Sequence, residues 1–219
     1  MQQEKMGDLK DFWKGRILDD LQPVLNSPVV IPMVTDPGGW DTKHIECYAR
    51  LLRIPNHRVL QGGRLFRHEE RAAYFRTALC GLHESVDIML DPDTGVARMR
   101  THGRPTTCTA KKNAQKNGTW NPSAYVFLDD IDGMCTGCRI VAVYSERREK
   151  LRDLETNLKG LGSDLALGGT NYCLVAYRGT GAAMIFISRD CSRLQTLTDH
   201  LTALMSPVEC HRITSLLQV

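Results

Sequence analysis

The chain has 219 residues, of which 42% are apolar, enough to build an ordinary globular core in one or two domains. Its formal charge of +3 is too small to point to a polyanionic partner, so local charge clusters carry more information. The apolar runs are shorter than the ~18 residues of a membrane span, and Met1 is followed by polar residues. We therefore expect a soluble, intracellular protein, nuclear or cytoplasmic, with no membrane partner.

The N-terminal part predicts three helices. Apolar residues recur every four positions over 8–25, and a second amphipathic pattern over 42–53 can be capped by Thr42. A third helix is predicted over 66–82, with a buried stripe of Ala72, Phe75, Leu79 and Leu82.

Strand patterns are interleaved with these helices. Residues 29–31 form a short extended segment among prolines. Asp91-Pro-Asp-Thr-Gly95 has turn chemistry, so 86–90 and 96–101 are predicted to pair as a β-hairpin. Residues 124–128 begin a further strand.

The rest of the chain follows the order βαββαβ. Its expected strands and helices are 139–144, 146–161, 172–177, 182–188, 192–204 and a final extended segment, 209–219. Because each helix shows one apolar stripe, we expect an open sheet with both helices on one face, as in ferredoxin-like domains. The predicted class is α+β. It comprises a helical region with a hairpin (1–104), a basic loop (105–119) and the βαββαβ unit (120–219), which could together form one continuous domain.

A basic segment lies between the hairpin and that unit. Residues 97–118 contain no Asp or Glu, and such a segment suits phosphate, although a solvated loop would look the same. Its basic residues are Arg98, Arg100, Arg104, Lys111, Lys112 and Lys116. A series of arginines upstream, between Arg50 and Arg76, could bind phosphate or form salt bridges with Glu69 and Glu70.

The chain contains eight cysteines, which we interpret as mainly reduced thiols; Cys47, Cys80, Cys173 and Cys191 are expected in the core. Cys135-Thr-Gly-Cys138 could hold half of a tetrahedral zinc site, with Cys108 as a candidate third ligand and His102, His83 and Cys210 as the alternatives. No other cofactor is indicated. A redox dithiol is disfavoured because a strand, not a helix, is predicted to follow the motif.

Catalytic signatures are weak. His83-Glu84 lacks the second histidine of a metallopeptidase helix, since Asp87 stands at that position, and the cysteine pair of a deaminase. A zinc- or thiol-dependent enzyme would require His83, Glu84, Cys108 and Cys135 to converge in one pocket. The missing catalytic set favours a non-enzymatic protein.

The segment from Cys138 onward resembles the DNA-binding domain of papillomavirus E2 proteins, and is similar in topology to the origin-binding domain of the Epstein-Barr nuclear antigen. The resemblance is carried by Ile185-Phe-Ile-Ser-Arg-Asp190, the helix 192–204, Ser206-Pro207 and the last strand. It implies a homodimeric barrel with residues 209–219 at the subunit boundary. It also implies a DNA-reading helix over 146–161 that presents Arg148, Arg152 and Lys159, although four acidic residues interrupt its basic face.

These observations predict a nucleic-acid-binding or regulatory protein, viral by resemblance, that contacts DNA or RNA phosphates through the basic segment. The competing interpretation is a viral or host adaptor, in which the arginines meet an acidic protein partner and a sheet edge pairs with another chain.

Overall fold

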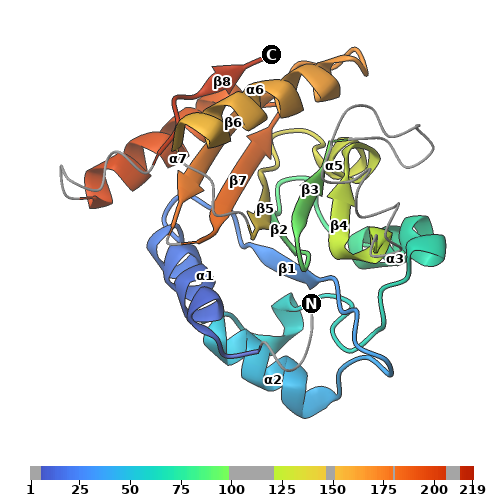
Figure 1. Ribbon diagram of the computed structural model, residues 1–219. Coiled ribbons are helices and arrows are strands. Elements are labelled where there is room, and N and C mark those ends of the chain that lie inside the picture. The colour runs from blue at the N-terminus through green and yellow to red at the C-terminus, as the bar shows by residue number, and fades with distance from the viewer. Residues whose placement is uncertain (1–5, 99–120, 147–150, 180, 206–212) are drawn as a thin grey trace.

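The computed structural model describes residues 6–98, 121–146, 151–179, 181–205 and 213–219 (Figure 1). A six-stranded mixed sheet crosses the molecule in the order β1-β2-β5-β7-β6-β8. A second pair of short parallel strands, β3 and β4, packs beside β5. The predicted α+β class is confirmed.

The elements follow the chain in a mixed order. The strands of the large sheet are β1 (Val29–Pro32), β2 (Ile88–Asp91), β5 (Val141–Ser145), β6 (Cys173–Arg178), β7 (Ala183–Ser188) and β8 (Leu217–Gln218). Those of the small sheet are β3 (Gly95–Ala97) and β4 (Tyr125–Phe127). The helices are α1 (Leu9–Asp20), α2 (Thr42–Leu51), α3 (Arg71–Leu79), α5 (Leu128–Met134), α6 (Leu151–Ala166) and α7 (Cys191–Leu204).

Three neighbouring strands of the large sheet run parallel. Pro32 at the end of β1 pairs with Asp91 at the end of β2, and Leu90 pairs with Val143 of β5. β7 is antiparallel to both β5 and β6, and β8 is antiparallel to β6. The carboxyl ends of β1, β2 and β5 therefore meet at one edge.

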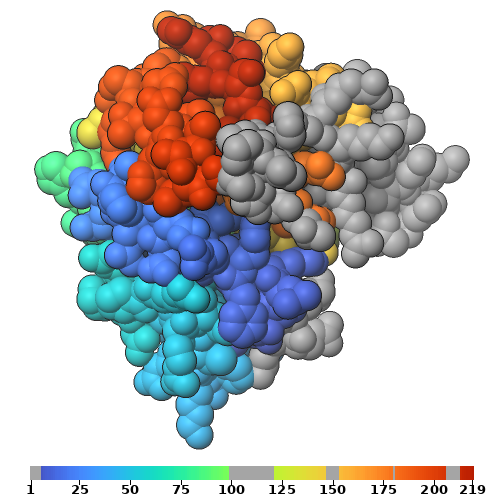
Figure 2. Space-filling view, turned by 90° about the vertical axis from the view of Figure 1, so that its left-hand side faces the viewer, coloured from blue at the N-terminus to red at the C-terminus, as the bar shows by residue number. Residues whose placement is uncertain are grey.

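Both faces of the sheet are buried under helices. On β5, Val141 and Val143 pack into one core with α6, whereas Ala142 and Tyr144 pack into a second core with α1, α2 and α7. Figure 2 shows α7 beside α1 on that second face, where His200 contacts the Asp20 carbonyl at 2.8 Å. The two helices of the C-terminal unit thus lie on opposite faces rather than on one. The physical reason is that strands apolar on both sides need cover on both faces.

The predicted βαββαβ order is observed as β5-α6-β6-β7-α7-β8. Its four strands do not form a sheet of their own, because the free edge of β5 pairs with β2. The single large sheet therefore contains strands from both sides of the basic segment.

The predicted hairpin is wrong. Both edges of β2 are occupied, by β1 and β5, so no edge is free for the following strand. Residues 95–97 instead form β3 and pair in parallel with β4. The Asp91–Gly95 turn thus leads the chain from one sheet to another.

The predicted helices are observed with other bounds: the helix expected over 66–82 is the shorter α3, and the one expected over 146–161 is α6, which begins and ends five residues later. α2 is capped by Asp41, whose carboxylate accepts from the His44 amide, and not by Thr42. In α3 the buried residues are Arg71, Tyr74, Phe75 and Ala78, so the buried face is rotated from the expected stripe and Ala72 is exposed. The shift follows from Arg71, whose burial depends on a partner that local periodicity does not show.

The cysteines also differ from expectation. Cys173 and Cys191 form a disulfide between β6 and the start of α7. Cys47 and Cys80 are free, as expected, but exposed. No described helix has both the length and the apolar character that crossing a bilayer would require.

Candidate functional site

A cluster of buried charged and phenolic side chains lies where the three parallel strands end. Lys14 extends from α1 to the carboxylates of Asp11, at 2.6 Å, and Asp91, at 2.7 Å. The Tyr48 hydroxyl of α2 donates to the same Asp91 carboxylate. The carboxyl ends of parallel strands are where open α/β sheets bind ligands, so this cluster, which we call the carboxyl-edge site, is the candidate functional site.

The local sequence explains why these groups meet. Asp11 and Lys14 are one turn apart on α1, which is capped by Asp8, so their side chains share one face. Gly15 lets α1 approach α2 closely, since a Cβ there would lie 2.1 Å from the Leu51 carbonyl oxygen. That contact brings Lys14 over the ends of the strands.

Burial sets the protonation of the site. Burial raises the pKa of Asp11, although Lys14 opposes this shift. For Lys14, desolvation would lower the pKa, but the two carboxylates prevail and the pKa is raised, so this ammonium stays charged. The pKa of Tyr48 is raised well above its usual value, first by burial and then by Asp91, so it remains a protonated donor.

Tyr144 of β5 completes the site. Its ring lies under the Lys14 ammonium, with 4.5 Å between Nζ and the ring centroid, in cation–π geometry. The residue is only 3% exposed, and its hydroxyl has no hydrogen-bond partner among the residues that the structure describes. Burial raises the pKa of this phenol too, so the group is a neutral hydroxyl.

Tyr144 is one of the residues that line a cavity of about 30 Å³. That volume accommodates a water molecule or the tip of a ligand, such as one hydroxyl or amino group. The residues that line it are Asp8, Lys10, Asp11, Lys14, Asp91, Pro92, Asp93, Tyr144 and Glu146. Five carboxylates against two ammonium groups give this lining a formal charge of −3, so it favours hydrogen-bond donors and cations over phosphate.

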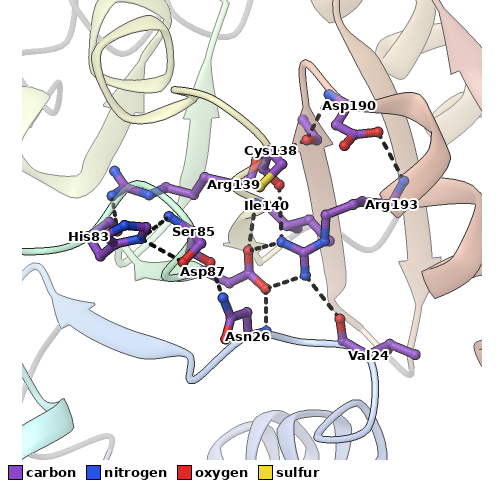
Figure 3. Close-up of polar contacts among 11 residues, drawn as sticks. Val24, Asn26, His83, Ser85, Asp87, Cys138, Arg139, Ile140, Asp190 and Arg193 are labelled. Carbon is purple, nitrogen blue, oxygen red and sulfur yellow. Dashed lines mark hydrogen bonds and ion pairs between the residues drawn. The ribbon is translucent and has the colours of Figure 1, made fainter.

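The opposite ends of the strands carry a structural brace (Figure 3). Asp87, directly before β2, accepts from both nitrogens of the Arg193 fork, at 3.0 and 2.9 Å, and from the Asn26 and Ile140 amides. Arg193 also donates to the carbonyls of Val24 and Cys138. This network joins α7, β2 and the loop before β1. Its donors and acceptors are matched, which indicates support and not ligand binding.

The predicted nucleic-acid residues are only partly visible. Arg98 follows β3 and pairs with Asp164 of α6 at 2.8 Å, while Lys159 is exposed on α6. Arg152 belongs to α6, but its side chain is not described. Arg100, Arg104, Lys111, Lys112, Lys116 and Arg148 lie outside the described residues.

The upstream arginines include structural ones. Arg71 is buried against Asp130, and Arg53 and Arg64 pair on the surface with Asp19 and Glu70. The expected salt bridge with Glu70 is therefore observed for Arg64, whereas Arg53 and Arg71 pair with other carboxylates.

Among the described zinc and thiol candidates, Glu84 lies beside the Cys135–Cys138 motif, since a Cβ at Gly137 would stand 3.4 Å from its carboxylate. Cys135 is buried, and burial raises the pKa of its thiol to about 12. Cys138 is partly exposed, and Cys108 lies outside the described residues. His83 contacts Ser85 through its ring and Arg139 through its carbonyl. Among described residues, no group of three or more His, Cys, Asp or Glu side chains could hold a metal.

Sequence reasoning missed the carboxyl-edge site. Asp91 and Asp93 have the local pattern of turn residues, and Asp11 and Lys14 interrupt the buried face of an amphipathic helix. That lysine, between Trp13 and Ile17, was the available signal.

Comparisons with known proteins leave the family open. No protein-family model matches the chain, and no curated protein matches it. Among solved structures, it is similar to protein LPL1258 from Legionella pneumophila, of the family DUF519, at 9% identity and a TM-score of 0.26. The match covers 96% of this chain and 94% of that one. A similarity at this level identifies neither a function nor a family.

Proposed function

We propose that the chain is a nucleic-acid-binding protein that contacts phosphates through the basic segment 98–116 and takes a donor group of a nucleotide into the carboxyl-edge site. The observation that carries the proposal is the buried Tyr144 hydroxyl: it has no hydrogen-bond partner among the described residues, and Tyr144 lines the cavity of the carboxyl-edge site. A buried hydroxyl without a partner is costly, and a ligand atom would satisfy it.

The carboxyl-edge site and the basic segment have opposite charges and would therefore bind different parts of a nucleotide. The acidic lining of the cavity would repel a phosphate but accept hydrogen bonds from a base amino group or a ribose hydroxyl. The basic segment has the opposite charge and begins at Arg98, directly after β3. The turn 92–95 links it to Asp91, so the two regions are close in the chain.

The first test is a salt titration of binding to a fluorescein-labelled single-stranded oligonucleotide, measured by anisotropy. We expect affinity to fall steeply with salt, and the substitution of Arg98, Arg100, Lys111 and Lys112 by Ala to weaken binding and flatten that slope by about 3. Replacing Arg16, Lys43, Arg178 and Arg189 by Ala removes the same charge outside the basic segment and the upstream arginine series, and is the matched control. Binding unchanged by the first quadruple substitution would overturn the phosphate assignment. Absent binding at ~0.15 M salt would favour the protein adaptor instead.

The second test addresses the pocket. Tyr144→Phe removes only the hydroxyl, so it should weaken nucleotide binding about tenfold while leaving the salt slope unchanged. Without ligand, the free energy of unfolding of the variant should equal or slightly exceed that of the wild type, because the substitution removes an unsatisfied buried hydroxyl. Equal affinity in the variant would remove the pocket from the proposal.

A further inference from the structure

A second, larger cavity lies between α3 and α5. Its volume of about 650 Å³ is in the range of small-molecule sites, and its described lining comes from α3, α5 and the short 3₁₀ turn η3 (His68–Glu70) that precedes α3. Phe75 and Met134 are buried at its wall, and Ala72 and Leu79 add further apolar surface. Gly133 of α5 leaves space there, since a Cβ at this position would meet no atom within 4 Å.

A buried ion pair forms the polar part of this cavity. Arg71 donates through Nη1 to Asp130 and through Nη2 to the carbonyls of Pro122 and Tyr125. Its guanidinium lies 4.4 Å from the Phe127 ring centroid. The residue is 3% exposed, and its Nε–H has no acceptor among the described residues. One donor of a buried guanidinium thus remains to be satisfied.

The charges around the cavity decide the class of ligand. Asp130 already balances Arg71, so an anionic ligand at the free Nε–H would also face the Asp130 carboxylate. Glu69 and Asp129 on the lining add negative charge, which Arg76 offsets only in part. A neutral acceptor such as a carbonyl oxygen satisfies the donor without this repulsion.

We propose that the cavity between α3 and α5 binds a neutral, largely apolar small molecule whose carbonyl oxygen accepts from Arg71 Nε. The apolar body would lie along Phe75 and Leu79 and beside Gly133. This site is separate from the carboxyl-edge site and does not depend on the proposed nucleic-acid function.

The probe that matches this chemistry is prodan, an uncharged naphthalene ketone whose emission shifts to the blue in apolar surroundings. We expect saturable binding to the full chain with a blue shift. Gly133→Leu fills the cavity and should weaken binding at least tenfold. Ala73→Leu places the same side chain on the exposed part of α3 and should change the affinity less than twofold. Circular dichroism checks folding, and Ala72→Leu, on the other wall, replaces Gly133→Leu if that variant misfolds.

A separate experiment tests whether the ligand is neutral. Arg76→Gln should leave prodan binding within twofold, and the anionic probe 8-anilinonaphthalene-1-sulfonate should bind this cavity at least tenfold more weakly than prodan. The absence of a blue shift up to the solubility limit, or equal prodan affinity in a folded cavity-filling variant, would overturn the site. Preferential binding of the sulfonate, lost in Arg76→Gln, would overturn the proposed ligand class.

Discussion

Asp87 and Arg193 lie 106 residues apart in the chain and are joined by two parallel hydrogen bonds at the amino end of β2. The carboxylate is buried, whereas the guanidinium is partly exposed. Removing the arginine would leave a buried charge whose remaining partners are two backbone amides. The geometry is bidentate, which a lysine cannot reproduce.

We therefore expect Arg193→Ala to lower the free energy of unfolding by about 3 kcal/mol, and Arg193→Lys to recover only part of this loss. Urea denaturation measures both. Arg16→Ala breaks an exposed pair with Asp20 and should cost less than about 1 kcal/mol. A similar small cost at Arg193 would show that the brace does not support the fold.

Lys14→Met should destabilise the protein in a pH-dependent way. At pH 7 the loss should be about 3–5 kcal/mol, because Asp11 and Asp91 remain buried without their cation. Without Lys14, which opposes the shift, the pKa of Asp11 rises further, and an acid with a raised folded pKa gains stability as pH falls. The difference from wild type should therefore shrink toward pH 4 in urea titrations. A constant difference would contradict this account.

Gly15→Ala and Gly133→Ala should have opposite effects, although both replace a helical glycine. At position 15 the added Cβ would meet the Leu51 carbonyl at 2.1 Å, so we expect a loss of about 2 kcal/mol or more. At position 133 the space is open, and the gain in helix propensity should stabilise the protein by up to about 1 kcal/mol. Thermal unfolding of the two variants distinguishes packing from propensity.

Asp130 should contribute to pH-dependent stability in a window from about 4 to 6. Burial raises the pKa of this carboxyl to about 6, against the opposing effect of Arg71. Because the folded pKa is raised, the stabilising contribution is present below the unfolded pKa and is lost as pH rises through 6. Between pH 4 and 7, the free energy of unfolding of the wild type should fall by up to about 3 kcal/mol more than that of Asp130→Asn. Parallel profiles would contradict the shift.

Most helices and strands could be predicted because their apolar periodicity is local. Leu154, Leu158 and Leu161 are buried along α6, and Leu194, Leu197 and Leu201 along α7, as their spacing of three and four requires. The order βαββαβ followed from the same pattern. The amphipathic spacing does not indicate which face of a sheet a helix covers. The prediction that α6 and α7 share one face is therefore wrong, and they lie on opposite faces.

Only the tertiary structure decided the pairing of strands and the content of the carboxyl-edge site. Asp91 has the sequence context of a turn. Because both edges of β2 are occupied, β3 cannot pair with β2 and pairs with β4 instead. Lys14, Tyr48 and Tyr144 come from α1, α2 and β5, and each has an ordinary local setting. Their meeting depends on how α1 crosses α2 at Gly15 above the parallel strands. Contacts between distant segments depend on that packing, which local periodicity does not encode. The sequence by itself therefore determined most of the elements, and the folded chain determined the site.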